Sequence, residues 1–162
     1  MKILVLSDSH SAFGFMRSCI EATAPDAMIH LGDYYPDGET MAEEYPHIPM
    51  YQVPGNCDLH RYFIPDPEIR IIELDGVRLY LTHGHRHGVK QSLLRLKADA
   101  KAANAQAALF GHTHVAHCQQ EDGLWMINPG ACSWGGSAAL LEIHAGRILQ
   151  CRFLRPDTLK DL

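Results

Sequence analysis

Side chains of the kinds that bind metals recur at five places in this chain, each at the end of a short apolar run. The five stretches are Asp8-Ser9-His10, Gly32-Asp33, Gly55-Asn56-Cys57-Asp58, His83-Gly84-His85 and Gly111-His112-Thr113-His114. Carboxylate and imidazole ligands together suit manganese, iron, zinc or nickel better than calcium or magnesium alone. Stretches of this kind that meet in space would form a metal centre, and such a centre indicates hydrolytic chemistry.

The elements that must bring these stretches together are β-strands. The runs that precede them are typical of strands over residues 2–7, 27–31, 50–53, 77–82 and 107–110. In an α/β sheet the carboxyl ends of the strands lie along one edge. Side chains that are remote in the sequence are therefore expected to meet at that edge.

The first half of the chain alternates strands with helices, which predicts a parallel sheet with right-handed crossovers. The helices are expected at 11–24, with Ser11 as the N-cap candidate, and at 39–44. An Asp75-Gly76 pair between two strand-like runs predicts a hairpin of 69–74 with 77–82.

The second half begins with the clearest predicted helix, residues 89–103, whose apolar side chains fall on one stripe. After strand 107–110 further strands are expected at 115–119, 123–127, 138–143 and 146–154. No linker or internal repeat interrupts the chain. The predicted fold class is α/β, with two sheets packed face to face, helices on the outside, and a single domain over residues 1–162.

The composition argues against several classes of protein. The chain has 162 residues, a net charge of −5 at pH 7 and no basic run, which is unlike a general nucleic-acid binder. No segment approaches ~20 consecutive apolar residues, so no membrane span is expected. The 5 cysteines include no C-x-x-C pair, so reduced thiols and a cytoplasmic location are expected.

The candidate metal ligands are two aspartates, one asparagine and four histidines: Asp8, Asp33, Asn56, His10, His83, His112 and His114. If Asp33 bridges two metals, each metal has four protein bonds and keeps open positions, as catalytic sites do. Two divalent metals outweigh the two carboxylates, and the site stays positive even with one bridging hydroxide. Such a site attracts a phosphate oxyanion and supplies a hydroxide nucleophile near neutral pH.

The order D-x-H, G-D, G-N-[HC]-D, H and G-H-x-H resembles the calcineurin-like metallophosphoesterase superfamily. The resemblance runs from residue 3 to about 150, and the short chain with Cys57 looks like the small single-domain phosphodiesterases. It implies an αββα sandwich and two divalent metals, manganese first, with iron, nickel, zinc or magnesium as alternatives. By this resemblance one metal binds Asp8, His10 and His114, the other binds Asn56, His83 and His112, and Asp33 binds both.

Two residues depart from the family pattern. Many relatives carry a histidine where Cys57 stands, and that histidine serves as a general acid or stabilises the transition state. His85 is the nearest substitute here, and a role at the surface is equally open for it. Ala131 stands where a serine usually follows the family's Asn-Pro-Gly turn. Asp58, next to Cys57, is expected to orient a metal ligand or to cap its turn.

The leading hypothesis is a metal-dependent phosphodiesterase that uses a hydroxide bridging two metals, with Asn56 and His85 as candidate catalytic residues. The expected substrates are small phosphate esters or nucleotide-type diesters. The alternatives are a phosphomonoesterase and a non-catalytic interaction scaffold, as in a retromer subunit that resembles this fold. A homo-oligomer also stays open, because relatives form dimers and larger assemblies.

Other residues near the motifs have two interpretations each. Five side chains could contact substrate or merely pack or face solvent, namely Tyr34, Tyr35, Arg61, Arg86 and Trp134. Five further histidines are expected at the surface, namely His47, His60, His87, His117 and His144.

Overall fold

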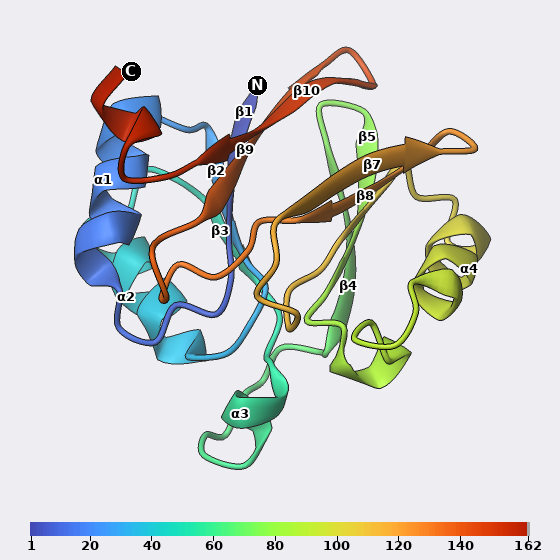
Figure 1. The fold of residues 1–162 in the computed structure, drawn as a ribbon, viewed down its shortest axis with the longest axis horizontal. Coiled ribbons are helices and arrows are strands. Elements are labelled where there is room, and N and C mark those ends of the chain that lie inside the picture. The colour runs from blue at the N-terminus through green and yellow to red at the C-terminus, as the bar shows by residue number, and fades with distance from the viewer. Residues whose placement is uncertain (162) are drawn as a thin grey trace.

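The computed structural model describes residues 1–161, in which two five-stranded sheets lie face to face (Figure 1). The first sheet has the order β10 (Arg147–Leu154), β9 (Ala138–His144), β1 (Lys2–Leu6), β2 (Ala27–His30), β3 (Met50–Gln52). The second has the order β4 (Ile69–Leu74), β5 (Val77–Thr82), β6 (Ala107–Leu109), β8 (Leu124–Asn128), β7 (His117–Glu121). In each sheet three neighbouring strands are parallel, β1–β2–β3 in one and β5–β6–β8 in the other.

Helices cover the outer faces of the sandwich. Helices α1 (Phe13–Thr23) and α2 (Tyr35–Glu44) lie on the first sheet, and α4 (Leu94–Ala102) lies beyond the second (Figure 1). The short helix α3 (Asn56–Leu59) projects from the lower end, and 3-10 turns occupy His85–His87 and Thr158–Asp161. The α/β, two-sheet αββα sandwich predicted from the sequence is therefore confirmed.

Strand β1 shows why its sequence is apolar throughout. Ile3 and Val5 pack between the two sheets, whereas Leu4 and Leu6 pack under α1 and α2. Successive side chains of a strand point to opposite faces, so a strand covered on both sides needs apolar residues at every position.

The first predicted helix begins later than expected. Helix α1 starts at Phe13, and its N-cap residue Ala12 makes no side-chain cap. Ser11 instead has a left-handed backbone with φ 63° and donates its N–H to the Asp37 carboxylate at 2.7 Å. The prediction of Ser11 as the N-cap is therefore wrong, because a contact with another helix determines its conformation.

The other helix boundaries also differ. The helix predicted at 89–103 begins only at Leu94, because Gly88 accepts N–H bonds from Gln91 and Ser92 in a tight turn. The helix predicted at 39–44 starts earlier, at Tyr35, with a proline in its first turn, where the missing N–H has no cost. No helix among residues 1–161 is long and apolar enough to cross a membrane.

Candidate metal centre

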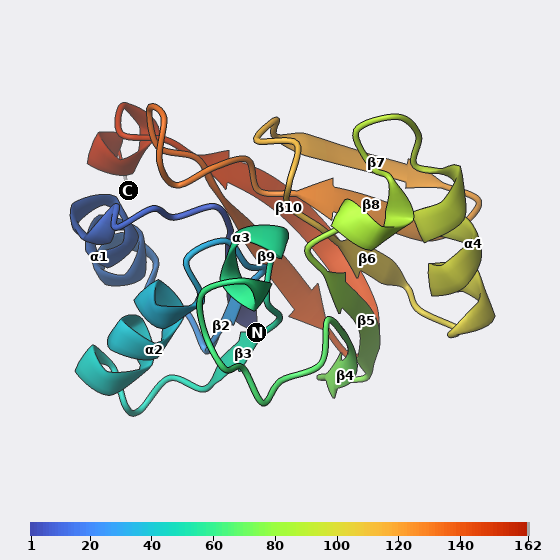
Figure 2. The ribbon, with the colours of Figure 1, turned by 90° about the horizontal axis from the view of Figure 1, so that it is seen from below.

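The loops after β1, β2, β3, β5 and β6 carry the predicted ligands at one end of the sandwich. This end lies at the bottom of Figure 1, and Figure 2 views the molecule from that side. The parallel strands of the two facing sheets both point their carboxyl ends this way. Residues separated by about a hundred positions consequently become neighbours, as when His112 N–H donates to the Asp8 carboxylate at 3.2 Å.

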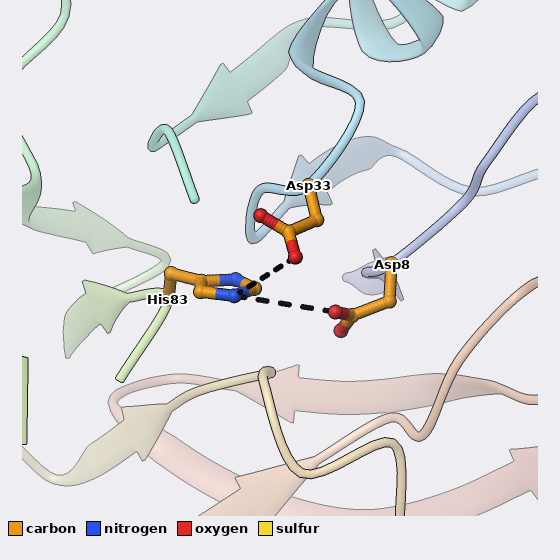
Figure 3. A group of neighbouring side chains, drawn as sticks. All are labelled: Asp8, Asp33 and His83. Atoms are coloured by element: carbon orange, nitrogen blue, oxygen red, sulfur yellow. Dashed lines mark ion pairs between the residues drawn. The ribbon is translucent and has the colours of Figure 1, made fainter. Parts of the chain in front are cut away.

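Asp8, Asp33 and His83 form the buried centre of the cluster (Figure 3). Their exposed fractions are 0%, 4% and 0%. His83 Nε2 lies 3.5 Å from Asp33 Oδ2 and 4.0 Å from Asp8 Oδ1. Two carboxylates hidden from water are costly unless a positive charge compensates them. One imidazole between them is a weak counter-charge, so this group has the character of a cation site.

The orientation of His83 suits a metal ligand. Its Nδ1 lies 2.7 Å from the carbonyl oxygen of Leu31, which can only accept a hydrogen bond. Nδ1 therefore carries a proton, and Nε2 points at the two carboxylates. A histidine that binds a metal commonly donates its second ring N–H to a backbone carbonyl in this way.

The remaining predicted ligands surround this group. His114 Nε2 lies 3.0 Å from Asp8 Oδ1, and the rings of His112 and His83 are 5.0 Å apart between centroids. The ring of His10 lies 6.4 Å from that of His114. Asn56 is held beside Asp33, because the next N–H, that of Cys57, donates to Asp33 Oδ1 at 3.0 Å. The structure thus groups Asp8, Asp33 and His83 closely enough to hold one ion, and it places the other four predicted ligands around them.

Three buried polar atoms at this place have no hydrogen-bond partner among the described residues: Asp8 Oδ1, Asn56 Oδ1 and His83 Nε2. Two are acceptor oxygens, and the third is a ring nitrogen of an imidazole. Buried polar atoms in folded proteins are nearly always satisfied. A set of atoms left without a hydrogen bond in this way fits a divalent cation, which would bind all three kinds of atom.

The backbone at the site is strained. Five of the seven predicted ligands have positive φ, namely Asp8 (52°), His10 (43°), Asp33 (56°), His112 (69°) and His114 (62°). For residues other than glycine this left-handed conformation costs about 1 kcal/mol or more each. Such strain persists only where the surroundings enforce it, and it is concentrated at functional sites.

Two glycines allow the strand ends to come this close. A Cβ on Gly55 would lie 2.1 Å from Asp33 Oδ1, and a Cβ on Gly111 would lie 2.1 Å from Ser7 Oγ and 2.9 Å from Asp8 Oδ2. Any side chain at either position would push a carboxylate of the cluster aside. These glycines are therefore needed because a side chain at either position would prevent the close contact between the loops.

Asp58 ties two of the loops together. Its Oδ2 accepts the N–H groups of Asp33 and Gly55, both at 2.8 Å, and its Oδ1 accepts that of Tyr35 at 2.8 Å. A fully buried carboxylate with three backbone donors is well satisfied. It holds the Asp33 turn against the turn that carries Asn56.

A second group of hydrogen bonds that holds a ligand-bearing loop in place was not predicted from the sequence. Ser9 lies between two predicted ligands, and its hydroxyl contacts His30 Nε2 at 3.0 Å and donates to Asp37 Oδ2 at 2.7 Å. His30 and Asp37 are both buried. A histidine inside an apolar strand, with an acid in the next helix, was the only signal available, and burial of both side chains depends on the packing of α2 against β2.

Burial and charge set the protonation of the cluster. Burial, reinforced by the charges of His83 and Lys90, lowers the pKa of His112 to about 4, so its imidazole is neutral at pH 7. Burial alone would raise the pKa of Asp33, but its contact with His83 and the Cys57 N–H hold that pKa well below its usual range. Burial alone would lower the pKa of His83, and the contact with Asp33 and the charge of Asp8 raise it. The negative charges that raise the pKa of His83 would equally attract a metal.

His85 and Cys57, both beside predicted ligands, differ in their surroundings. His85 lies with its ring 5.6 Å from that of His83, and its Nε2 is 3.4 Å from Glu68 Oε2, while its Nδ1 is buried without a partner among the described residues. Cys57 is half-buried, and burial together with the charge of Asp33 raises the pKa of its thiol. At neutral pH the thiol is uncharged and a weak hydrogen-bond donor.

Several expectations at the margin of the site change. His87 is buried, with its Nε2 3.1 Å from the Tyr80 hydroxyl, so its predicted surface position is wrong. Tyr35 is buried too, and its hydroxyl donates to the carboxylate of Asp66, so it packs beneath the rim. Trp134 is 83% exposed and follows Ser133, whose hydroxyl donates to the Asp8 carbonyl.

The other histidines behave more simply. His117 is half-buried and only partly matches its predicted surface position, since its Nε2 is buried and has no partner in residues 1–161. The remaining three histidines expected at the surface are exposed, namely His47, His60 and His144.

Comparisons with known proteins identify the family of this chain. A family model described as the calcineurin-like phosphoesterase superfamily domain matches residues 1–146. A probable metallophosphoesterase of Mycoplasma pneumoniae is 33% identical over 133 residues, which cover 80% of this chain and 78% of that protein. Phosphodiesterase MJ0936 of Methanocaldococcus jannaschii is 27% identical over 146 residues, 82% of this chain and 84% of that protein.

A solved structure extends the comparison to the fold. The crystal structure of a predicted phosphoesterase from Streptococcus pneumoniae superposes with a TM-score of 0.77 at 26% identity, and covers 96% of this chain and 90% of that one. Vps29 from Entamoeba histolytica, in a single-mutant form, has a TM-score of 0.73 at 19% identity, and covers 96% of this chain and 99% of that one. At that identity the second similarity concerns the fold alone.

Proposed function

Because this chain belongs to the calcineurin-like phosphoesterase superfamily, we propose that it is a metal-dependent phosphodiesterase with two divalent cations at the edge described above. One observation carries the proposal. Asp8 Oδ1, Asn56 Oδ1 and His83 Nε2 are buried and make no hydrogen bond among the described residues, and the ring nitrogens that approach Asp8 Oδ1 belong to His114 and His83, which are themselves predicted ligands. That arrangement suits cations, and family membership makes the chain a hydrolase of phosphate esters.

The ligand assignment follows the family order of the motifs. One cation would be held by Asp8, His10 and His114, the other by Asn56, His83 and His112, and Asp33 would contact both. The mixture of carboxylate, amide and imidazole donors favours manganese, with iron, nickel, zinc or magnesium as alternatives. When bound, two such cations neutralise phosphate oxygens and provide a hydroxide nucleophile near neutral pH.

The chain's own residues would bind and orient these groups. Leu31 fixes the ring of His83, and Asp58 fixes the turn of Asp33. Asn128 donates from Nδ2 to the Gly111 carbonyl at 2.9 Å and to Thr113 Oγ1 at 3.0 Å, which fixes the loop between His112 and His114. Because these supports are buried, the ligands keep their positions without induced ordering, a condition for efficient catalysis.

The residue at position 57 affects how the leaving group can be protonated. A neutral thiol at Cys57 cannot supply the positive charge or the proton of an imidazolium. We propose that His85, with one ring nitrogen buried and unpartnered among the described residues, handles a proton near the leaving group. A diester carries one negative charge on the reacting phosphate, fewer than a monoester, and so requires less cationic assistance. Phosphodiesterase MJ0936, by its name, acts on diesters.

The proposal is tested with the metal-stripped protein and manganese. Bis(p-nitrophenyl) phosphate should be hydrolysed only after manganese is restored, faster than p-nitrophenyl phosphate, with two manganese ions bound per chain by elemental analysis. Faster monoester turnover would favour the phosphomonoesterase. Two bound ions with hydrolysis of neither ester would favour the interaction scaffold, and fewer than two ions in an active protein would exclude the dinuclear site.

Four broader expectations belong to the same proposal. Residues 1–162 would act as one domain and work without nucleic-acid or membrane partners. All five cysteines are free thiols, which fits a reducing compartment and a cytoplasmic location. A homo-oligomer remains a prediction from the family resemblance, and gel filtration with light scattering would measure it.

A further inference from the structure

Arg61 is attached to the same structural unit as the predicted ligand Asn56. Asn56 begins helix α3, and Arg61 follows directly after its C-cap residue His60. The N–H of Arg61 donates to the carbonyl of Asp58 at 2.9 Å. Because the Asp58 carboxylate binds the N–H of Asp33, the backbone of Arg61 is fixed relative to the metal centre.

The side chain of Arg61 lies on an aromatic ring that borders the site. Its guanidinium carbon lies 5.9 Å from the centre of the Tyr34 ring, and its Nη1 is 3.4 Å from the Tyr34 hydroxyl. Tyr34 also contacts His10, whose ring centre is 4.4 Å away. The guanidinium is therefore linked to a predicted metal ligand through a single ring.

The charge of Arg61 is available to a ligand. Its side chain is exposed, and no carboxylate among residues 1–161 forms an ion pair with it. Arg86, the other arginine near the motifs, is paired with Glu68 at 3.3 Å. The two arginines had the same two interpretations from the sequence, and the structure separates them. Of the two, Arg61 has guanidinium N–H groups that no carboxylate among residues 1–161 occupies. A guanidinium of this kind can bind a phosphate group through two parallel hydrogen bonds.

We propose that Arg61 and Tyr34 form a second anion site beside the metal centre, which binds a phosphate group of the substrate other than the scissile diester. This inference rests on the proposed function and specifies its substrate class. Because the Tyr34 ring contacts both Arg61 and the predicted ligand His10, Arg61 would meet a group farther along the substrate than the phosphate at the cations. A phosphodiester that also carries a terminal phosphate, such as a phosphorylated dinucleotide, has a second anion at such a place.

The test compares ligands that differ only in the terminal phosphate. Thymidine dinucleotides with no terminal phosphate, a 5′-phosphate or a 3′-phosphate are titrated into the manganese-loaded protein by calorimetry, with methylene groups in place of the bridging oxygens to prevent cleavage. One of the phosphorylated forms should bind about tenfold more tightly than the unphosphorylated one, since a charge-assisted contact is worth that much. Cleavage of the ordinary dinucleotides is measured separately.

Three variants identify the residue responsible. Arg61→Ala should abolish the tenfold advantage and leave binding of the unphosphorylated form unchanged, and Arg61→Lys should keep part of it. Arg147→Ala removes the same charge at the far end of the sandwich and should keep the whole advantage. Arg147 begins β10, after the turn that follows β9.

The outcomes are distinct. The inference fails if the wild-type protein shows no preference for either phosphorylated form, if Arg61→Ala retains the preference, or if Arg147→Ala loses it. Failure to cleave any dinucleotide or chromogenic diester, with the binding preference intact, would count against the proposed function alone, because the anion site is measured without turnover. Circular dichroism of each variant checks that the fold is preserved.

Discussion

The two ends of the sandwich both contain residues with positive φ, yet for different reasons. At the end away from the metal centre, three hairpins turn through Asp75-Gly76, Asp122-Gly123 and Ala145-Gly146, all with positive φ. Two-residue turns of this kind match the twist of their strands, and Asp-Gly is a preferred sequence for them. At the metal end the left-handed residues include two aspartates and three histidines among the predicted ligands, together with Ser11 and Tyr34.

Tertiary contacts enforce the strained conformations at the metal end. The N–H of Asp8 donates to the Gly32 carbonyl at 2.9 Å, and the N–H of Ser9 to the Asp33 carbonyl at 3.3 Å. These bonds join loops that follow different strands. The hairpin end is therefore specified locally, whereas the metal end is specified by contacts among loops that meet only in the folded chain.

The largest expected effect comes from Asp33→Asn, which removes one charge from the metal end. The asparagine keeps an oxygen to accept the Cys57 N–H, so the fold should remain intact. Mutation of a residue that only hydrogen-bonds to a metal ligand typically lowers metal affinity or activity by about 10–100-fold. Loss of a ligand itself has a larger effect, so diester turnover should fall by at least about a hundredfold. Manganese titration and turnover measure this, and wild-type turnover in the variant would contradict the bridging role.

Alanine at two glycines distinguishes the two ends directly. Gly111→Ala places a Cβ 2.1 Å from Ser7 Oγ and should cost about 1–3 kcal/mol of stability and weaken manganese binding. Gly123→Ala meets nothing within 4 Å in its hairpin, so only its φ of +78° is unfavourable, at about 1 kcal/mol, and metal binding should not change. Urea unfolding and metal titration give both quantities. Equal metal affinities in the two variants would contradict the proposed role of loop contact at Gly111.

A smaller and opposite effect is expected from Cys57→His. The imidazole can supply the proton and positive charge that the thiol lacks, so hydrolysis of p-nitrophenyl phosphate should rise by about tenfold, less than a well-positioned acid achieves. Cys57→Ser is the control, and it should give no gain. No increase with histidine would mean that residue 57 does not limit monoester chemistry.

The smallest effect concerns pH and compares His87, near the metal end, with His144, at the hairpin end. Burial lowers the pKa of His87, with Arg95 and Arg86 acting in the same direction and Asp99 against it. The unfolded chain then binds a proton that the folded chain resists, so stability falls as the pH drops below about 6.5. His87→Gln should make the free energy of unfolding fall less between about pH 7.5 and 5, and a similar change in His144→Gln would contradict the assignment to burial.

Much of the fold could be predicted because its signals are local. The apolar runs of β1, β2, β5 and β6 and the Asp75-Gly76 turn indicated strands and a hairpin without reference to the rest of the chain. The helix boundaries at Phe13 and Leu94 could not be predicted, because a contact with Asp37 and a turn at Gly88 decide them. Helix propensity is a property of the segment alone, whereas the residues at which a helix begins and ends depend on contacts with the rest of the protein.

The candidate site also has features that the sequence predicted and features that it did not. The types and order of all seven predicted ligands, taken together, indicate a metal site. Burial of His87 and the separate pairing of Arg86 with Glu68 had no counterpart in the sequence pattern, and the only signal for the burial of His30 was its place in an apolar strand before an acidic helix residue. Each depends on which surfaces the packing of helices and loops covers.

The sequence by itself determined which donor side chains follow the strands and therefore that they lie on one edge, because strand direction and alternation are properties of short segments. Only the tertiary structure decided that three polar atoms of the predicted ligands would be buried without a hydrogen bond in the described part of the chain, that five ligand residues would adopt left-handed backbone, and that Arg61 would lie over Tyr34. Those features arise from contacts between residues far apart along the chain, and these contacts form only when the two sheets pack together.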